Sequence, residues 1–250
     1  MMRCRVLILS AALLAGATSA QAQEWYTGAA RTPQNDTRPS VAIDLSLTGS
    51  SQDSKTGTLI GTIAPFSKLE ETGLRLRLSG LLGSYNYIST TAGVGRVQGT
   101  QASGSLLVGY EWVTRTATFA GYIGAEINNN NLDKVDIQNK SAGMAGGLKV
   151  SADFYANPTD YTMVSGVFSF STAHMSYYAR LKAGIAIVDR IFVGPEVLFL
   201  GDNFYSQWRA GAHVSGLRFG ALQFGLSGGY VSDRVRGTGF YGILDARITF

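Results

Sequence analysis

Apolar residues alternate with polar or small residues along almost the whole chain from Ser40 to the C-terminus, and this period of two limits the available folds more than any other feature. The alternation is cleanest in Leu74–Leu78 and in Leu244–Ile248. A period of two places neighbouring side chains on opposite faces of a β-strand, whereas a helix needs a period of 3.6. The sequence therefore predicts an all-β chain whose strands each have one apolar face.

Twelve strands are predicted, most of them close to the roughly 9 to 11 residues with which a tilted strand crosses a bilayer. The chain has 31 Gly, 12 Tyr and 12 Phe against 5 Pro, a composition that suits a many-stranded sheet. An even number of strands returns both chain ends to the same side. The predicted strands are 40–48, 57–66, 73–84, 97–112, 115–127, 142–155, 161–171, 176–188, 191–199, 206–217, 219–231 and 239–250.

The predicted connections alternate between long polar segments and tight turns, except that the link 67–72 is intermediate in length and 172–175 is unexpectedly short. Outer-membrane barrels have long external loops and short periplasmic turns, and a soluble sandwich has no reason to sort its loops in this way. The expected fold is therefore an antiparallel up-and-down transmembrane β-barrel. The segment 128–141, which begins with four asparagines, is predicted to be its longest outer loop. The longer connections lie around 49–56, 85–96, 128–141, 200–205 and 232–238, and the tight ones around 113–114, 156–160, 189–190 and 218.

Aromatic residues on the apolar face support the barrel, because the topology already fixes their depth. If the first strand runs outward, one group falls at the outer rim and a second group at the periplasmic rim. Two such girdles are typical of outer-membrane barrels, whereas the core of a soluble sandwich would not sort aromatics by strand end. The outer group is Phe170, Tyr177, Phe199, Trp208, Tyr230 and Phe240, and the periplasmic group is Tyr110, Trp112, Phe154 and Phe250.

The N-terminus has the pattern of a secretory signal peptide. Arg3 and Arg5 precede an apolar run at 6–17, and a small-residue cleavage pattern ends at Ala22. Cleavage there removes Cys4, the only cysteine, so the mature chain is expected to have no thiol for a disulfide or a metal site.

The other end of the chain has the pattern of an assembly signal. Phe250 is the last residue, and apolar or small residues occupy alternate positions before it from Gly242. This resembles the C-terminal signal that the barrel assembly machinery reads. We therefore expect a signal peptide at 1–22, a periplasmic segment at 23–39 and a barrel at 40–250, in the outer membrane of a Gram-negative bacterium. Outer-membrane lipid and the assembly machinery are the expected partners.

The face opposite the apolar one carries charges of both signs, which an outer-membrane barrel points into its lumen. A turn centred on Asp189 would place Lys182 across from Glu196, and an arginine of the tenth predicted strand is expected beside that glutamate. We interpret the charges as structural ion pairs that fill the lumen, with the selectivity ring of a pore as the alternative. The inward residues are Asp44, Arg75, Arg77, Glu111, Glu126, Lys149, Asp153, Arg180, Lys182, Glu196, Arg209, His213, Asp245 and Arg247.

Two further inferences come from this inward face. Closure of the barrel would bring Asp44 of the first strand beside Arg247 of the last. Inward tyrosines could stack on sugar rings, although packing inside a small barrel explains them equally well. These tyrosines are Tyr122, Tyr155, Tyr178 and Tyr241.

Catalysis has few candidates. The two histidines both occur as His-x-Ser, with Ser176 after His174 and Ser215 after His213. Outer-membrane lipid hydrolases use a Ser/His pair, and this spacing does place both side chains on one face of a strand. However, the base of such a pair needs an orienting partner, and no glutamate follows Ser215. No catalytic residue, metal site or cofactor is predicted, and the chain is not expected to be an enzyme.

The formal net charge of +4 gives no indication of nucleic-acid binding.

Four stretches of the second half carry a family resemblance: Val193–Val197, Gly201–Asp202, Gln207–His213 and Ser227–Tyr230. They resemble the alphaproteobacterial cellulose biosynthesis protein S family. The resemblance is strongest over 176–250 and looser over 40–153. It implies an outer-membrane protein accessory to cellulose production or export, with cellulose or components of the cellulose synthase complex as partners. A general small-solute porin and a lipid hydrolase of the lipid A deacylase or phospholipase type are the alternatives.

Overall fold

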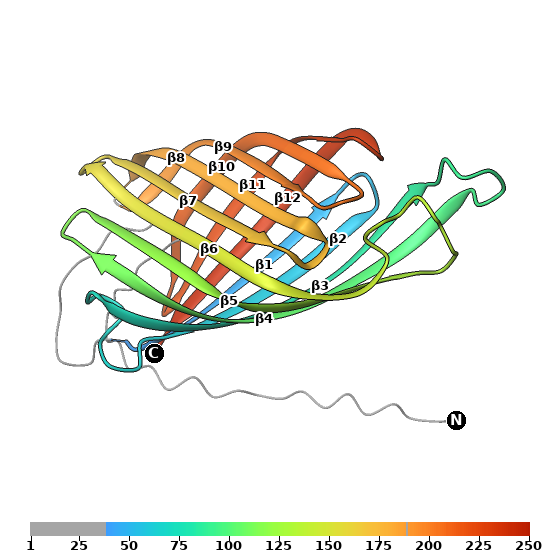
Figure 1. Ribbon diagram of the computed structural model, residues 1–250. Helices are drawn as coiled ribbons and strands as arrows, with labels where there is room; N and C mark the ends of the chain where they lie inside the picture. The colour runs from blue at the N-terminus through green and yellow to red at the C-terminus, as the bar shows by residue number, and fades with distance from the viewer. Residues whose placement is uncertain (1–38, 189) are drawn as a thin grey trace, which may run out of the picture.

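The computed structural model describes residues 39–188 and 190–250, and these form a closed antiparallel barrel of twelve strands (Figure 1). Each strand pairs with the next along the chain, and β1 pairs with β12 to close the sheet. The expected fold is confirmed, whereas the signal peptide predicted at 1–22 and residues 23–38 of the predicted periplasmic segment lie outside the described residues. The strands are β1 (Val41–Ser50), β2 (Ser54–Ile63), β3 (Gly73–Ile88), β4 (Arg96–Val113), β5 (Ala117–Leu132), β6 (Gly143–Thr159), β7 (Thr162–Ser171), β8 (Ser176–Val188), β9 (Ile191–Gly201), β10 (Ser206–Phe219), β11 (Leu222–Asp233) and β12 (Gly237–Thr249).

The outer surface of the barrel is apolar because each strand turns its apolar face outward. Leu78 and Leu106 are each 64% exposed and are paired in register on β3 and β4, and Leu148 on β6 is 63% exposed. Side chains of this kind are stable on the outside of a protein only where lipid covers them, and a closed barrel leaves no unpaired strand edge in the hydrocarbon. This exterior places the protein in the outer membrane, which is the bilayer that holds barrels of this type.

Aromatic side chains form contacts with one another at both ends of the apolar surface. Tyr110 and Trp112 have ring centroids 5.0 Å apart near the periplasmic end, and Phe119 lies 5.9 Å from Trp112. At the outer end, Trp208 and Tyr230 are 5.6 Å apart. Such residues settle where hydrocarbon meets headgroups, because one part of the ring is apolar and the polar part reaches water.

The four asparagines predicted to begin the longest outer loop are part of a strand instead. Asn128 to Asn131 are strand residues that continue β5, and the loop occupies 133–142. The hairpins β3–β4 and β5–β6 are therefore long and extend beyond the other strands at the outer end (Figure 1). Asparagine is a poor strand former in isolation, but here the backbone is paired on both sides and Asn128 and Asn130 face the polar lumen.

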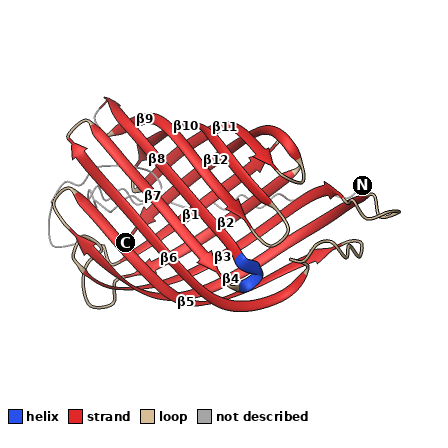
Figure 2. Ribbon diagram, turned by 45° about the horizontal axis from the view of Figure 1, so that its top comes forward, coloured by secondary structure: helices blue, strands red, loops and turns tan. Residues whose placement is uncertain are grey.

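Two connections at the ends of β7 and β10 complete the fold. A 3₁₀ turn, η1 (Ala173–Met175), joins β7 to β8 (Figure 2). In the part of the chain that the structure describes, no helix is long and apolar enough to cross a membrane.

The turn predicted at 218 is wrong, because β10 continues to Phe219 through a bulge between Val214 and Leu217. A bulge adds a residue without ending the pairing, so the alternation shifts while the strand continues.

The last residue closes the barrel through its backbone and leaves its ring outside. The amide of Phe250 donates to the carbonyl of Val41 (2.9 Å), and its carbonyl oxygen accepts from the amides of Ser40 (2.7 Å) and Val41 (3.1 Å). The phenylalanine side chain is 61% exposed. Backbone closure and the aromatic signal can therefore be separated by substitution.

We expect Phe250→Ala to lower the amount of assembled barrel while the barrel that does form stays stable, because the substitution keeps the backbone hydrogen bonds. Assembled protein is measured as the band that migrates faster in a detergent gel before heating than after it. Phe240→Ala is the matched control, since Phe240 is an outward phenylalanine of β12 at the opposite rim and Phe250 directly follows that strand. Equal amounts of assembled protein in the two variants would remove the assembly role of Phe250.

Candidate functional site

The lumen has two parts, a periplasmic half that side chains fill and an outer half that contains a cavity. Large side chains in the filled half are almost fully shielded from solvent. Phe192 and Met163 are each 1% exposed, and both pack with Tyr155 in one apolar cluster. A side chain that projects into a lumen can be this buried only if other side chains occupy the space around it, so this half is a packed core.

A network of buried charges lies above this core, and we call it the Arg180 cluster. The guanidinium of Arg180 contacts Glu196 Oε2 through Nη2 at 2.7 Å and Asp245 Oδ2 at 2.9 Å. Lys182 Nζ lies 3.2 Å from Asp245 Oδ2 and 3.8 Å from Glu196 Oε2. All four side chains are 3% exposed or less. The cluster consists of Arg180, Lys182, Glu196 and Asp245 with the hydroxyls of Ser46, Ser227 and Tyr241, which donate to the two carboxylates.

The Arg180 cluster spans the lumen. Arg180 and Lys182 are on β8, whereas Asp245 is on β12, and three strands separate these two along the sheet. The contacts therefore form a chord across the barrel interior. Water is displaced from this level, because two cations and two carboxylates fill it with matched hydrogen bonds.

The structure brings together some of the residues singled out in the sequence and separates others. Lys182 lies directly opposite Glu196 in the register of β8 and β9, and Asp44 lies opposite Arg247, with Asp44 Oδ1 3.5 Å from Arg247 Nε. Arg209, expected beside Glu196, is elsewhere. Its Nε donates to Gln207 Oε1 at 2.7 Å.

The reason is that Tyr241 occupies that side of Glu196. The tyrosine hydroxyl donates to Glu196 Oε1 at 3.0 Å, and the guanidinium of Arg209 lies over the tyrosine ring at 5.3 Å. Arg180 lies beside Glu196, in the position predicted for Arg209. The signal for this was present, because Arg180 precedes Lys182 by two residues and therefore shares its strand face.

A second chord links β3 to β6. Arg77 Nη2 lies 2.5 Å from Asp153 Oδ2, and the guanidinium stacks 3.7 Å from the ring centroid of Tyr122 on β5. The tyrosine ring fits because residue 109 on the neighbouring strand is glycine, whose missing Cβ would otherwise overlap the ring. Cation and aromatic ring together fill the width of this half of the barrel.

The periplasmic mouth is closed by the connection 64–72. Arg75 points into the lumen, where its Nε donates to Glu111 Oε2 at 2.6 Å, and its Nη2 donates to the backbone carbonyls of Leu69 (3.3 Å) and Glu71 (2.5 Å). These bonds hold the connection inward. Leu69 is consequently 2% exposed and packs on Ala42.

The His-x-Ser pair of β10 forms a hydrogen bond but has no room for a substrate. His213 Nδ1 lies 2.8 Å from Ser215 Oγ, and His213 Nε2 lies 3.1 Å from the carbonyl oxygen of Ala183. The carbonyl can only accept, so Nε2 carries the proton and Nδ1 accepts from the serine hydroxyl. His213 is 1% exposed and Ser215 is 0% exposed. A nucleophile must touch its substrate, and this serine is packed on every side.

The other histidine lies at the outer end, with Nε2 of His174 3.2 Å from the carbonyl oxygen of Gly143. Among residues 39–188 and 190–250, no group of three or more His, Cys, Asp or Glu residues is arranged to hold a metal ion.

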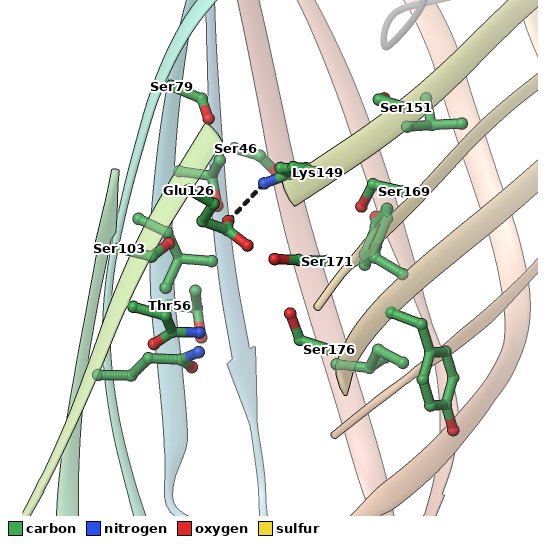
Figure 3. Close-up of a pocket in the computed structure, with 18 of the residues that line it drawn as sticks. Ser46, Thr56, Ser79, Ser103, Glu126, Lys149, Ser151, Ser169, Ser171 and Ser176 are labelled. Carbon is green, nitrogen blue, oxygen red and sulfur yellow. Dashed lines mark hydrogen bonds and ion pairs between the residues drawn. The ribbon is translucent and has the colours of Figure 1, made fainter. Parts of the chain in front are cut away.

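The outer half of the lumen contains a cavity lined mainly by hydroxyl groups, and we call it the outer cavity (Figure 3). Its volume is about 220 Å³. Its charged residues include the pair Glu126 and Lys149, whose Oε1 and Nζ are 2.6 Å apart. The hydroxyl and amide side chains of the lining are Ser46, Thr48, Thr56, Thr58, Ser79, Gln101, Ser103, Asn128, Ser151, Ser169, Ser171 and Ser176.

Tyrosines lie at the outer side of this cavity. Tyr177, Tyr178 and Tyr205 line it directly. A smaller space continues outward past Tyr205 to Tyr85 and Tyr87, whose rings stack with centroids 6.3 Å apart. Of the four inward tyrosines found in the sequence, only Tyr178 faces the cavity.

The loop 133–142 folds against this outer space. Tyr87 donates its hydroxyl hydrogen to Asp136 Oδ2 at 2.9 Å and accepts from Asn139 Nδ2 at 3.2 Å. Burial raises the pKa of Asp136, but hydrogen bonds from Thr91, Ser89 and the amide of Gln138 outweigh burial and set the pKa below its ordinary value. The carboxylate is therefore charged at neutral pH and holds the loop on β3.

Sequence reasoning missed the hydroxyl lining, although a signal for it exists. Serine or threonine occupies alternate positions in Thr56 and Thr58, in Ser103 and Ser105, and in Ser169 and Ser171. Small polar residues at inward positions leave space, whereas long charged residues fill it. The sizes of the inward side chains therefore indicate the cavity, which their charges do not.

We expect Glu196→Gln to destabilise the barrel by about 3 kcal/mol, because the change leaves Arg180 and Lys182 with too little negative charge in a buried site. Glu126→Gln is the matched control. It removes a lumen glutamate whose partner Lys149 borders the cavity and has a side chain 18% exposed, so we expect a loss of about 1 kcal/mol. Urea unfolding of the refolded barrel measures both values. Equal losses would show that the Arg180 cluster has no special role in stability.

Comparisons with known proteins place the chain in a family. In structure, it resembles a KdgM porin (10% identity, TM-score 0.45, 84% of this chain and 99% of that chain). It also resembles the translocator domain of the autotransporter NalP from Neisseria meningitidis (12% identity, TM-score 0.46, 84% of this chain and 88% of that chain). A third likeness is to LpxR from Salmonella typhimurium (12% identity, TM-score 0.43, 84% of this chain and 100% of that chain). Nothing about the activity of this chain follows from these likenesses, and no curated protein matches its sequence. Residues 12–250, by contrast, match the model of a single sequence family. The chain belongs to the cellulose biosynthesis protein BcsS family.

Proposed function

We propose that the protein is a non-catalytic accessory of cellulose production or export in the outer membrane. The family supports the process, and the barrel supports the location. The observation that carries the non-catalytic part is the filled lumen. The charged groups of the Arg180 cluster bind one another at 2.7 to 3.2 Å, so this cluster is satisfied by partners within the protein.

The same observation argues against a general porin. Porins of about 16 to 18 strands leave an aqueous channel, whereas twelve strands enclose less space. Here the space that remains in the periplasmic half is crossed by the Arg180 cluster and by the pair of Arg77 and Asp153. Cellulose or components of the synthase complex are the partners that we propose for such a barrel.

A lipid hydrolase is the second candidate, because His213 and Ser215 do form a hydrogen bond of 2.8 Å. Two features oppose it. Neither residue lines the outer cavity, and Nε2 of the histidine faces a backbone carbonyl instead of a carboxylate. The expected products of such an enzyme give a direct way to recognise it.

Deletion of the protein should reduce extracellular cellulose, while cellulose synthase activity in isolated inner membranes stays normal, because the lesion lies in the outer membrane. Extracellular cellulose and glucan synthesis in the membrane fraction are measured in the same strains. Re-expression of the intact chain is the control. A deletion strain with normal cellulose and altered acylation of lipid A or phospholipid would favour the hydrolase.

The purified barrel should show a conductance far below that of a porin of about 16 strands in planar bilayers, since packed side chains block the periplasmic half. Glu196→Ala with Asp245→Ala removes both carboxylates of the Arg180 cluster and should raise the conductance if the variant folds. A large, steady conductance of the unchanged protein would contradict the filled lumen.

A further inference from the structure

The outer cavity is separate from the packed half of the lumen, and the proposed accessory role makes no use of it. We propose that the outer cavity is a binding site for a segment of a neutral glucan chain, which enters from the cell exterior. The glucan identity rests on the proposed function, whereas the preference for a neutral saccharide rests on the lining.

The polar groups of the lining are suited to sugar hydroxyls. Serine and threonine hydroxyls both donate and accept hydrogen bonds, and the amides of Gln101 and Asn128 offer the same two roles in fixed directions. A ligand with a hydroxyl on nearly every carbon can be bound by such groups at many points. Figure 3 shows Ser103 on one wall and Ser169 and Ser171 on the opposite wall, with Thr56 nearby.

Two buried acceptors in this lining have no hydrogen-bond partner within the protein. Asn128 Oδ1 belongs to a side chain that is 2% exposed, and Glu126 Oε2 to one that is 5% exposed. Glu126 uses its other oxygen for Lys149. An unpaired buried acceptor costs free energy unless a group that enters the cavity donates to it, and a sugar hydroxyl is such a donor.

The charges of the cavity favour a neutral ligand over an acidic one. Lys149 is paired with Glu126, and Arg77 is paired with Asp153. Arg209, the third cation of the lining, donates to Gln207 and lies over the Tyr241 ring. An acidic saccharide with a carboxylate on every ring would need more than this one cation, and its carboxylates would approach Glu126.

Aromatic rings line the route into the cavity. Tyr177, Tyr178 and Tyr205 border it, and Tyr85 borders the space farther out. The faces of sugar rings are apolar, so they stack on aromatic rings while their edges form hydrogen bonds. Tyrosines at the outer side and hydroxyls on both walls therefore match the two kinds of surface of a pyranose chain.

The inner end of the cavity is closed. Leu107, Leu198 and Ile243 line it, and each is at most 4% exposed. Arg77 lies at the same end and belongs to the chord with Asp153. A glucan segment can be held here, but it has no passage to the periplasm.

Calorimetric titration of the full barrel tests this proposal, in a detergent without a sugar headgroup. Cellohexaose is the probe, and hexagalacturonate is the acidic comparison. We expect cellohexaose to bind at one molecule per barrel and hexagalacturonate to bind at least tenfold more weakly. No binding of cellohexaose, or tighter binding of the acidic saccharide, would overturn the proposal.

Three variants locate the site. Asn128→Ala removes an unpaired acceptor and should weaken cellohexaose binding by about fivefold to tenfold, as expected for one hydrogen bond. Ser103→Tyr fills the cavity and should abolish binding. Asn131→Ala is the matched control, because Asn131 is an exposed asparagine of the same strand and should bind like the unchanged protein. Unchanged affinity in both cavity variants, with folding shown by heat-dependent migration, would also overturn the proposal.

The outcome is independent of the cellulose phenotype. If deletion lowers extracellular cellulose but the barrel binds no cellohexaose, the accessory function stands and the glucan site is rejected. If the barrel binds cellohexaose and deletion leaves cellulose unchanged, the site stands and the accessory function is rejected.

Discussion

The bridge that Arg180 makes between Glu196 and Asp245 is the interaction on which the lumen depends. A charge in a place without water is costly, and it is tolerated only where opposite charges and hydrogen bonds surround it. Here one guanidinium lies between two carboxylates from different strands, and three hydroxyls bind the remaining lone pairs. The geometry requires β8, β9 and β12 to keep a fixed separation. The cluster therefore braces the barrel at the width that twelve strands give it, as well as filling it.

Lipid on the outside explains why the charges gather in the lumen at all. Each strand must present apolar side chains outward, so every polar side chain of a membrane-crossing strand has only the interior to occupy. Long side chains such as Arg77 fill that interior, and short ones such as Ser103 leave it open. The boundary between the packed half and the outer cavity is consequently a boundary between side-chain sizes along the same inward face.

How much could be predicted from the sequence depends on which physical rule decides the feature. A period of two with one apolar face identifies each strand, and a short turn fixes which residues face each other on consecutive strands. The barrel and the position of Lys182 opposite Glu196 could therefore be predicted from the sequence. The residues that meet across the lumen are decided by the tilt and curvature of the closed sheet, which no local pattern contains. The contact of Arg180 with Asp245 was therefore out of reach.

The outer cavity opens toward the cell exterior, and this direction determines at which stage of export a glucan chain could enter it. Its inner end lies against buried side chains, whereas its outer end is bordered by tyrosines and by the loop 133–142. A ligand can reach it only from outside the cell. On the proposed function, glucan would meet this barrel after it has crossed the outer membrane by another route. The protein would then act by holding an emerged segment, and the buried ion pairs beneath the cavity would keep the membrane sealed while it does so.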